Sequence, residues 1–183
     1  MSNHQLFAPL TVLGLLALAS TASAQTFPSG AGNLAGTERL SVPGCGRDGG
    51  LISVALTAQP FACVAGGPSL VAPCTGGAWT ATIGASSYAG TGDAINERLA
   101  RLTLDAASLA ALEAALEADA SALCEETVTI TSLTANAAFK VNKRQTRAWL
   151  GLRARARGTN AGGDEGIALY TLRARGPWQP PQQ

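Results

Sequence analysis

Five arginines near the C-terminus stand at alternate positions, a spacing that could place them together to bind anions. The first group is Arg153, Arg155 and Arg157, and the second is Arg173 and Arg175. Alternate residues of a β-strand point to one face and lie about 6.8 Å apart. Because guanidinium groups make paired contacts with phosphate and carboxylate groups, this spacing predicts a basic strand face that binds an anionic partner.

The formal net charge of +1 hides two oppositely charged segments. Residues 93–126 hold eight acids and two bases, whereas residues 140–175 hold nine bases and two acids. Two interpretations remain open: the basic face contacts an anionic polymer such as envelope polysaccharide or nucleic acid, or it is a solvated face neutralised by the protein's own acidic helix. The predicted polyanion-binding residues are the five arginines together with Lys140 and Lys143.

The four cysteines indicate disulfides rather than a metal site. Their spacing contains no Cys-x-x-Cys pair, so a zinc site of cysteines alone is disfavoured. Thiols of exported proteins pair in oxidising compartments, and four cysteines allow three pairings. We favour Cys63–Cys74, which closes a loop containing glycine and proline, and Cys45–Cys124, which ties the N-terminal segment to the end of a helix.

The only histidine, His4, lies in a segment that we expect to be removed. Ser-His-Asp and Cys-His catalysis need an imidazole base, and the common His-containing metal sites need an imidazole ligand. We therefore predict no catalytic residue, no metal and no cofactor. Paired carboxylates at Glu125 and Glu126, or an oxygen-ligated calcium loop at residues 90–97 or 160–165, are weaker alternatives.

The N-terminus has the pattern of a signal peptide. An apolar run at residues 7–19 precedes Ala22, Ser23 and Ala24, a small-x-small site suited to cleavage after Ala24. The run has about 13 residues, too few for a helix to cross a bilayer roughly 30 Å thick. We expect a secreted or periplasmic chain without transmembrane insertion once residues 1–24 are cleaved.

Hydrophobic periodicity predicts one helix within a β-rich chain. Asp105 is a suitable N-cap for a helix that continues to residue 120 or 123 and carries Leu109, Leu112, Leu116 and Leu123 on one stripe. Strands are expected at residues 51–58, 79–83, 99–104, 127–133, 139–142, 149–157 and 167–175. The last two form a hairpin in which Arg157 lies opposite Ile167, and residues 158–166 form its tip.

Three tryptophans raise the question of sugar stacking. Trp79 and Trp149 belong to strand patterns and are expected in the core, whereas Trp178 in the proline-rich tail is the more exposed candidate. The sequence therefore predicts one solvent-accessible indole, at Trp178.

The predicted fold is mainly β (α+β): an antiparallel sheet or sandwich of about seven strands, with one Ala/Leu-rich helix packed on it and two disulfides. The expected organisation is a signal peptide (1–24), a flexible arm and Gly-rich loop (25–50), a globular β-rich domain (51–175) and a Pro-rich tail (176–183). Residues 84–92 are expected as a turn or loop.

The pattern favours an exported, non-catalytic binding or structural module of the cell envelope. The alternative is a secreted inhibitor or partner-binding domain that docks on another envelope protein through its hairpin or an edge strand. A carboxylate-dependent hydrolase is the third and most distant reading.

Overall fold

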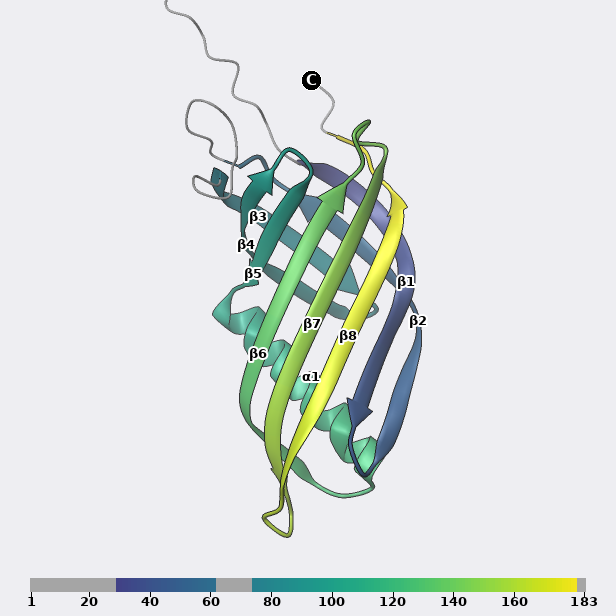
Figure 1. Cartoon of the computed structure of the whole chain (residues 1–183), viewed down its shortest axis with the longest axis vertical. Helices are drawn as coiled ribbons and strands as arrows, with labels where there is room; N and C mark the ends of the chain where they lie inside the picture. Colours follow the sequence, from purple (N-terminus) through teal and green to yellow (C-terminus); the bar gives the residue numbers. More distant parts are fainter. Residues whose placement is uncertain (1–28, 62–73, 181–183) are drawn as a thin grey trace, which may run out of the picture.

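The computed structural model describes residues 29–61 and 74–180, which form a closed antiparallel barrel with one helix. Each strand pairs with its neighbours in sequence, and the last strand pairs with the first (Figure 1). The expectation of a mainly β fold with one helix is therefore confirmed, and closure of the sheet is the new feature. The elements are β1 (Gly30–Val42), β2 (Gly46–Ala58), β3 (Cys74–Ile83), β4 (Ser86–Asn96), β5 (Leu99–Leu104), α1 (Ala106–Cys124), β6 (Val128–Val141), β7 (Arg147–Asn160) and β8 (Glu165–Pro177).

Strand periodicity separates a core inside the barrel from a polar exterior. Along β7, Leu150, Leu152 and Ala154 are buried and alternate with exposed residues. β1 follows the same rule, since Leu34 and Leu40 occupy inward positions. Alternation of this kind fixes the register, because a slip by one residue would turn every apolar side chain outward.

The helix α1 completes the lower part of the barrel, where two strands lack a strand neighbour. β2 pairs with β3 only at residues 54–58, and β6 pairs with β5 only at residues 137–140. α1 packs against the remaining part of β6, and its side chains bind that strand's edge: the Val128 N–H donates to Ser121 Oγ (2.9 Å), and the Ile130 N–H donates to Glu117 Oε2 (3.1 Å). The helix thus satisfies donors that an edge strand would otherwise expose.

Both ends of α1 are fixed to the barrel. Asp105 caps the helix by accepting from the Ser108 N–H (2.7 Å), and Ser108 Oγ accepts from the Ala89 N–H of β4 (2.7 Å). At the other end, a disulfide joins Cys124 to Cys45 in the turn between β1 and β2. The predicted N-cap and the predicted Cys45–Cys124 pair are confirmed.

The helix buries a narrower stripe than the leucine spacing indicates. The buried residues are Ser108, Leu112, Leu116 and Ala120, four residues apart, while Leu109 and Leu123 are half-buried at its sides. Small residues at the two ends of the buried stripe let the helix approach the strands closely.

The glycine-rich segments are strands, contrary to the expectation of an arm and loops. Residues 30–50 lie mostly in β1 and β2, and residues 86–92 belong to β4. Glycine is required there because neighbouring strands approach closely: a Cβ atom on Gly36 would overlap the carbonyl oxygen of Arg173, and one on Gly90 would overlap that of Thr103. At these two strand positions, glycine marks close backbone contact.

The C-terminal segment also differs from its expected exposed form. Trp178 is only 3% exposed and packs against Phe139, with ring centroids 4.8 Å apart. The prediction of an exposed Trp178 is therefore wrong, because β8 extends to Pro177 and the next residues continue its course, with Gln179 forming a bridge to Ala31.

Several predictions fall on residues outside the described ranges. They are the signal peptide at residues 1–24 and the Cys63–Cys74 pair, because Cys63 belongs to the segment 62–73. Within residues 29–61 and 74–180, Cys45–Cys124 is the disulfide that the structure shows. No helix in these ranges is long and apolar enough to cross a membrane.

Candidate anion-binding groove

The arginines of the C-terminal hairpin lie on the outer face of the barrel, as their spacing predicts. β7 and β8 pair so that Arg157 is opposite Ile167, the predicted register. The side chains of Arg153, Arg155, Arg157, Arg173 and Arg175 are all exposed, whereas the residues between them point into the core. The prediction that these arginines share one sheet face is confirmed; their role in binding is taken up below.

Pairing across the sheet extends this basic face to the flanking strands. Trp149 of β7 lies between Lys140 of β6 and Arg175 of β8, and Arg175 lies beside Ala35 of β1. Cations from two different strands, β6 and β8, therefore flank Trp149 on the surface.

The neighbouring row of residues forms a floor without large side chains. Gly151 lies between Ala138 of β6 and Arg173 of β8, and a Cβ atom added at Gly151 would meet nothing within 4 Å. Arg101 of β5 borders the row on one side, opposite Ala138. The face is consequently hollowed at its centre and rimmed by long cationic side chains.

A groove of about 1310 Å³ follows this hollow along the outside of the barrel. We call it the basic groove. Its outward-facing lining includes five cations and two polar or aromatic side chains beside the Gly151 floor: Arg101, Lys140, Arg153, Arg173, Arg175, Asn136 and Trp149. None of the residues that line the groove is an acid.

The cations of the basic groove are close enough to repel one another. Paired residues of adjacent strands lie about 5 Å apart and alternate residues of one strand about 6.8 Å apart, both within the Debye length of about 8 Å at physiological salt. Within the described ranges, none of these five side chains forms an ion pair with a carboxylate. Binding of an anion would relieve this repulsion.

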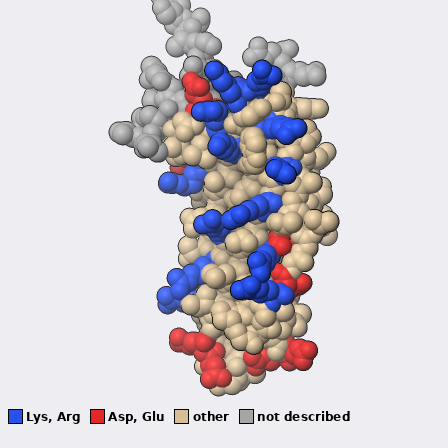
Figure 2. Space-filling view, turned by 45° about the vertical axis from the view of Figure 1, so that its right-hand side comes forward, with Lys and Arg blue, Asp and Glu red and all other residues tan. Residues whose placement is uncertain are grey.

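Most acidic residues lie outside the basic groove, although Asp93 of β4 is paired opposite Arg101 in the sheet. Figure 2 shows Lys and Arg spread over most of this face, whereas Asp and Glu form two clusters at its lower end and smaller patches at the top and at the middle of the right-hand side. α1, the most acidic element, packs against the inner side of the β6 edge rather than on the basic face. The interpretation in which the acidic helix neutralises the arginines is therefore not supported by the arrangement.

Trp149 is the exposed indole of the groove, contrary to the prediction that it belongs to the core. Its side chain is 38% exposed. The register is set by Leu150 and Leu152, which point inward, so Trp149 points outward with the arginines. Trp79, in contrast, is buried as predicted and donates its indole N–H to the Thr91 carbonyl oxygen (3.0 Å).

The structure does not bring all predicted binding residues into the groove. Arg155 and Arg157 continue the basic face beyond its lining, and Lys143 lies in the turn between β6 and β7. Sequence reasoning missed Arg101, although its position in the alternating segment 99–104 marks it as outward-facing. It also missed Asn136, because residues 134–138 carried no clear strand pattern.

The weaker sequence candidates find other surroundings. The Asn160 amide nitrogen is 3.3 Å from both Glu126 Oε1 and Asp164 Oδ2, so these carboxylates accept from the amide rather than forming a calcium loop. Residues 90–96 lie in strand β4. Within the described ranges, no group of three or more His, Cys, Asp or Glu side chains could hold a metal ion.

Comparisons of the chain with protein-family models, with curated proteins and with solved structures give no match, so function must be inferred from the basic groove itself.

Proposed function

We propose that this protein is an exported, non-catalytic module that binds an acidic polysaccharide of the cell envelope in the basic groove. One observation carries the proposal: five cations from four strands surround a floor of small residues, and no acid lines the groove. Repulsion between these cations lowers the stability of the folded state unless an anion binds among them.

A polysaccharide is favoured over other anionic polymers by the position of Trp149. Its exposed indole lies directly between Lys140 and Arg175 in the pairing of the sheet. An apolar ring face beside cations suits a sugar ring that carries a carboxylate or sulfate group, because the ring stacks while the charged group pairs. Nucleic acid could use the same cations, and the experiment below separates the two polymers.

An exported location belongs to the same proposal. The sequence pattern of residues 1–24 is typical of a signal peptide, and the Cys45–Cys124 disulfide is typical of an oxidising compartment. A periplasmic or extracellular protein meets envelope polysaccharides directly.

The alternative of docking on a protein partner by an edge strand has less support. The barrel is closed in the described residues, and α1 side chains occupy the edge of β6 where β5 ends. A strand added from another protein needs unpaired backbone groups, which these contacts reduce at Val128 and Ile130 of β6; in the described part of the chain, an edge without a strand partner remains at residues 46–53 of β2.

The charge requirement is tested by heparin chromatography with two charge-matched variants. The groove triple Arg153/Arg173/Arg175→Ser removes three cations that line the groove, and the control triple Arg47/Arg98/Arg144→Ser removes three exposed cations outside it. The wild type is expected to bind at low salt, the groove triple to elute much earlier, and the control triple to elute near the wild type. Equal elution of the two triples would show that net charge alone governs retention.

The shape requirement is tested at the floor of the groove. Gly151→Leu places a side chain in open space above the floor, so the fold is expected to keep its stability while the bound polymer is displaced. Affinity for an oligosaccharide of polygalacturonate and for a thymidine oligonucleotide of equal charge is then compared in the wild type and in Trp149→Ala. Preference for the oligosaccharide, lost in Trp149→Ala, supports the proposal; tighter oligonucleotide binding would assign the groove to nucleic acid.

A further inference from the structure

A second cavity lies inside the barrel, where α1 replaces the missing strand contacts. It has a volume of about 510 Å³, within the usual range of pockets for small organic ligands. Ile52, Leu112 and Leu116 give it an apolar wall, and Leu51, Ser53, Gly84 and Ser86 form an exposed rim at β2 and the β3–β4 turn. We call this cavity the inner pocket.

The inner pocket is acidic, in contrast to the basic groove outside. Glu38 and Asp119 line it, and no lysine or arginine does. Glu38 occupies an inward position of β1, between the inward-facing Gly36 and Leu40. Asp119 projects from α1, and the pKa of its carboxyl is raised by burial and by the negative charges of Glu38 and Asp48. Two carboxylates therefore face the pocket without a cation among its lining residues.

Two tyrosines add hydroxyl groups to the same wall. Tyr170 of β8 donates its hydroxyl to Glu38 Oε2 at 2.7 Å, which orients the carboxylate. Burial, followed by this hydrogen bond and the charge of Glu38, raises the pKa of Tyr170, so its hydroxyl keeps its proton at all ordinary pH values. Tyr170 is thus a fixed donor, and Glu38 retains its other oxygen for a ligand.

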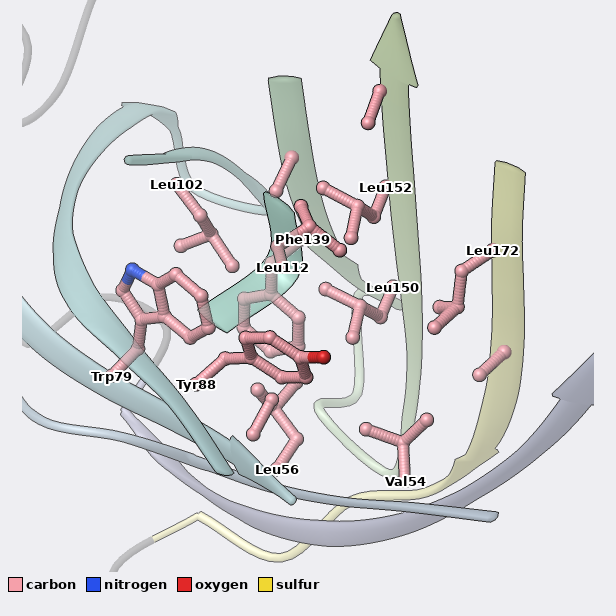
Figure 3. Packing of buried hydrophobic residues seen from close by; sticks show 14 of the residues in the cluster. Val54, Leu56, Trp79, Tyr88, Leu102, Leu112, Phe139, Leu150, Leu152 and Leu172 are labelled. Atoms are coloured by element: carbon pink, nitrogen blue, oxygen red, sulfur yellow. The ribbon is translucent and has the colours of Figure 1, made fainter. Parts of the chain in front are cut away.

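The hydroxyl of Tyr88 is the feature that indicates a bound molecule. Its side chain is only 8% exposed and lines the inner pocket, yet within the described ranges its hydroxyl has no hydrogen-bond partner. Figure 3 shows the Tyr88 hydroxyl directed into the interior, toward Leu150 and away from β4. The hydroxyl is open to the pocket rather than sealed in the core, so a ligand in the pocket can form a hydrogen bond with it.

We propose that the inner pocket binds a small organic cation: a protonated amine carried on an apolar body. The ammonium group would pair with Glu38 and Asp119 and meet the Tyr88 hydroxyl, and the apolar body would pack against Leu112 and Leu116. An anion would be repelled by the two carboxylates. A neutral molecule would displace water from the carboxylates without pairing with their charge. This inference does not depend on polymer binding in the basic groove.

The charge of the ligand is tested with three probes of nearly equal shape. Isothermal titration calorimetry compares 2-phenylethylamine, 2-phenylethanol and phenylacetate on the full chain. The amine is expected to bind at least about tenfold more tightly than the alcohol, and the carboxylate is expected not to bind. Equal affinity for amine and alcohol, or no binding of the amine, would overturn the proposal.

The location of the site is tested with matched acid variants. Glu38→Gln and Tyr88→Phe are expected to lower affinity for the amine at least about tenfold and to leave affinity for the alcohol nearly unchanged. Glu126→Gln removes an acid outside the inner pocket and serves as the control. If Glu38→Gln fails to fold, Asp119→Asn replaces it, because Asp119 is the more exposed of the two acids. An equal loss of amine binding in Glu126→Gln would show adventitious binding to the acidic surface.

Discussion

The two faces of one sheet carry opposite charges on consecutive residues. On β8, Tyr170 points inward to Glu38, whereas Arg173 and Arg175 point outward into the basic groove. On β1, Glu38 faces the inner pocket and the adjacent Arg39 is exposed. One backbone thus separates an acidic cavity from a basic surface.

The contrast between the basic groove and the inner pocket shows what each kind of charged site requires from a small barrel. Outward cations need only exposure and register, because water solvates them when no partner is bound. The inner carboxylates need a cavity, and α1 forms one wall of that cavity through Leu112, Leu116 and Asp119. We therefore expect the inner pocket to depend on the integrity of the fold far more than the basic groove does.

The largest effect is expected from release of the helix that closes the inner pocket. Removal of the Cys45–Cys124 disulfide by a double substitution to alanine opens a loop with a sequence separation of 79 residues. In the chain-entropy model this costs roughly 4 to 5 kcal/mol of the free energy of unfolding. Urea denaturation of both proteins under non-reducing conditions measures it, and a loss below about 1 kcal/mol would show that α1 is held by its packing alone.

Two adjacent residues of β8 give the most direct comparison of the faces. Leu172 is buried in the core, and Leu172→Ala is expected to cost about 2 to 4 kcal/mol through lost burial and the cavity left behind. Arg173→Ala removes an exposed cation and is expected to change stability by less than about 0.5 kcal/mol. Thermal unfolding of both variants checks the contrast, and a large loss in Arg173→Ala would mean that the groove arginines contribute to folding.

The hydrogen bond across the inner pocket is expected to have a smaller effect. Tyr170→Phe keeps the buried ring but deprives Glu38 of its donor. Hydrogen bonds to charged groups contribute about 1.5 to 3 kcal/mol, and access of water to the pocket should place this one near the lower limit. Denaturant unfolding at pH 7 measures the loss; Tyr88→Phe, whose hydroxyl has no partner in the described part of the chain, is the matched control and should lose little.

The sequence was sufficient for features that depend on local pattern. Asp105 followed by apolar residues at helical spacing predicted α1, and the alternation around Arg153 and Arg173 predicted both the strand faces and the register of the hairpin. The pairing of Cys45 with Cys124 followed from the position of Cys124 at the end of the helix. Each of these inferences needs only neighbours in the chain.

Features that depend on long-range contact were missed. Glycine normally weakens a strand, so the sequence predicts an arm and a loop where the structure has β1 and part of β4. Only the close approach of a neighbouring strand explains Gly36 and Gly90. Without β1, Glu38 has no predicted strand face, so the sequence does not predict the inner pocket. Closure of the barrel likewise depends on the pairing of β1 with β8, across most of the chain.

The smallest effect is expected for the charge of Asp119 in the inner pocket, measured as the dependence of folding stability on pH. The pKa of Asp119 is raised from its ordinary value of 3.8 by burial and by Glu38 and Asp48, so the folded state favours the protonated acid. This stabilising contribution is complete below pH 3.8 and is lost as the pH rises through the folded-state pKa. At pH 7 the ionised Asp119 therefore works against folding, and Asp119→Asn should be more stable than the wild type by less than about 1 kcal/mol, because solvent screens an exposed carboxylate.

The gap between Asp119→Asn and the wild type should narrow as the pH falls toward 3, which urea unfolding across pH 3 to 7 would measure. Glu113→Gln, on the same helix but outside the inner pocket, should show no such pH-dependent gain. A wild type that is the more stable protein at pH 7 would mean that Asp119 already has a cationic partner. Higher stability of Asp119→Asn at pH 7 together with weaker binding of 2-phenylethylamine would show that the carboxylate of Asp119 is kept for ligand binding at a cost in folding stability.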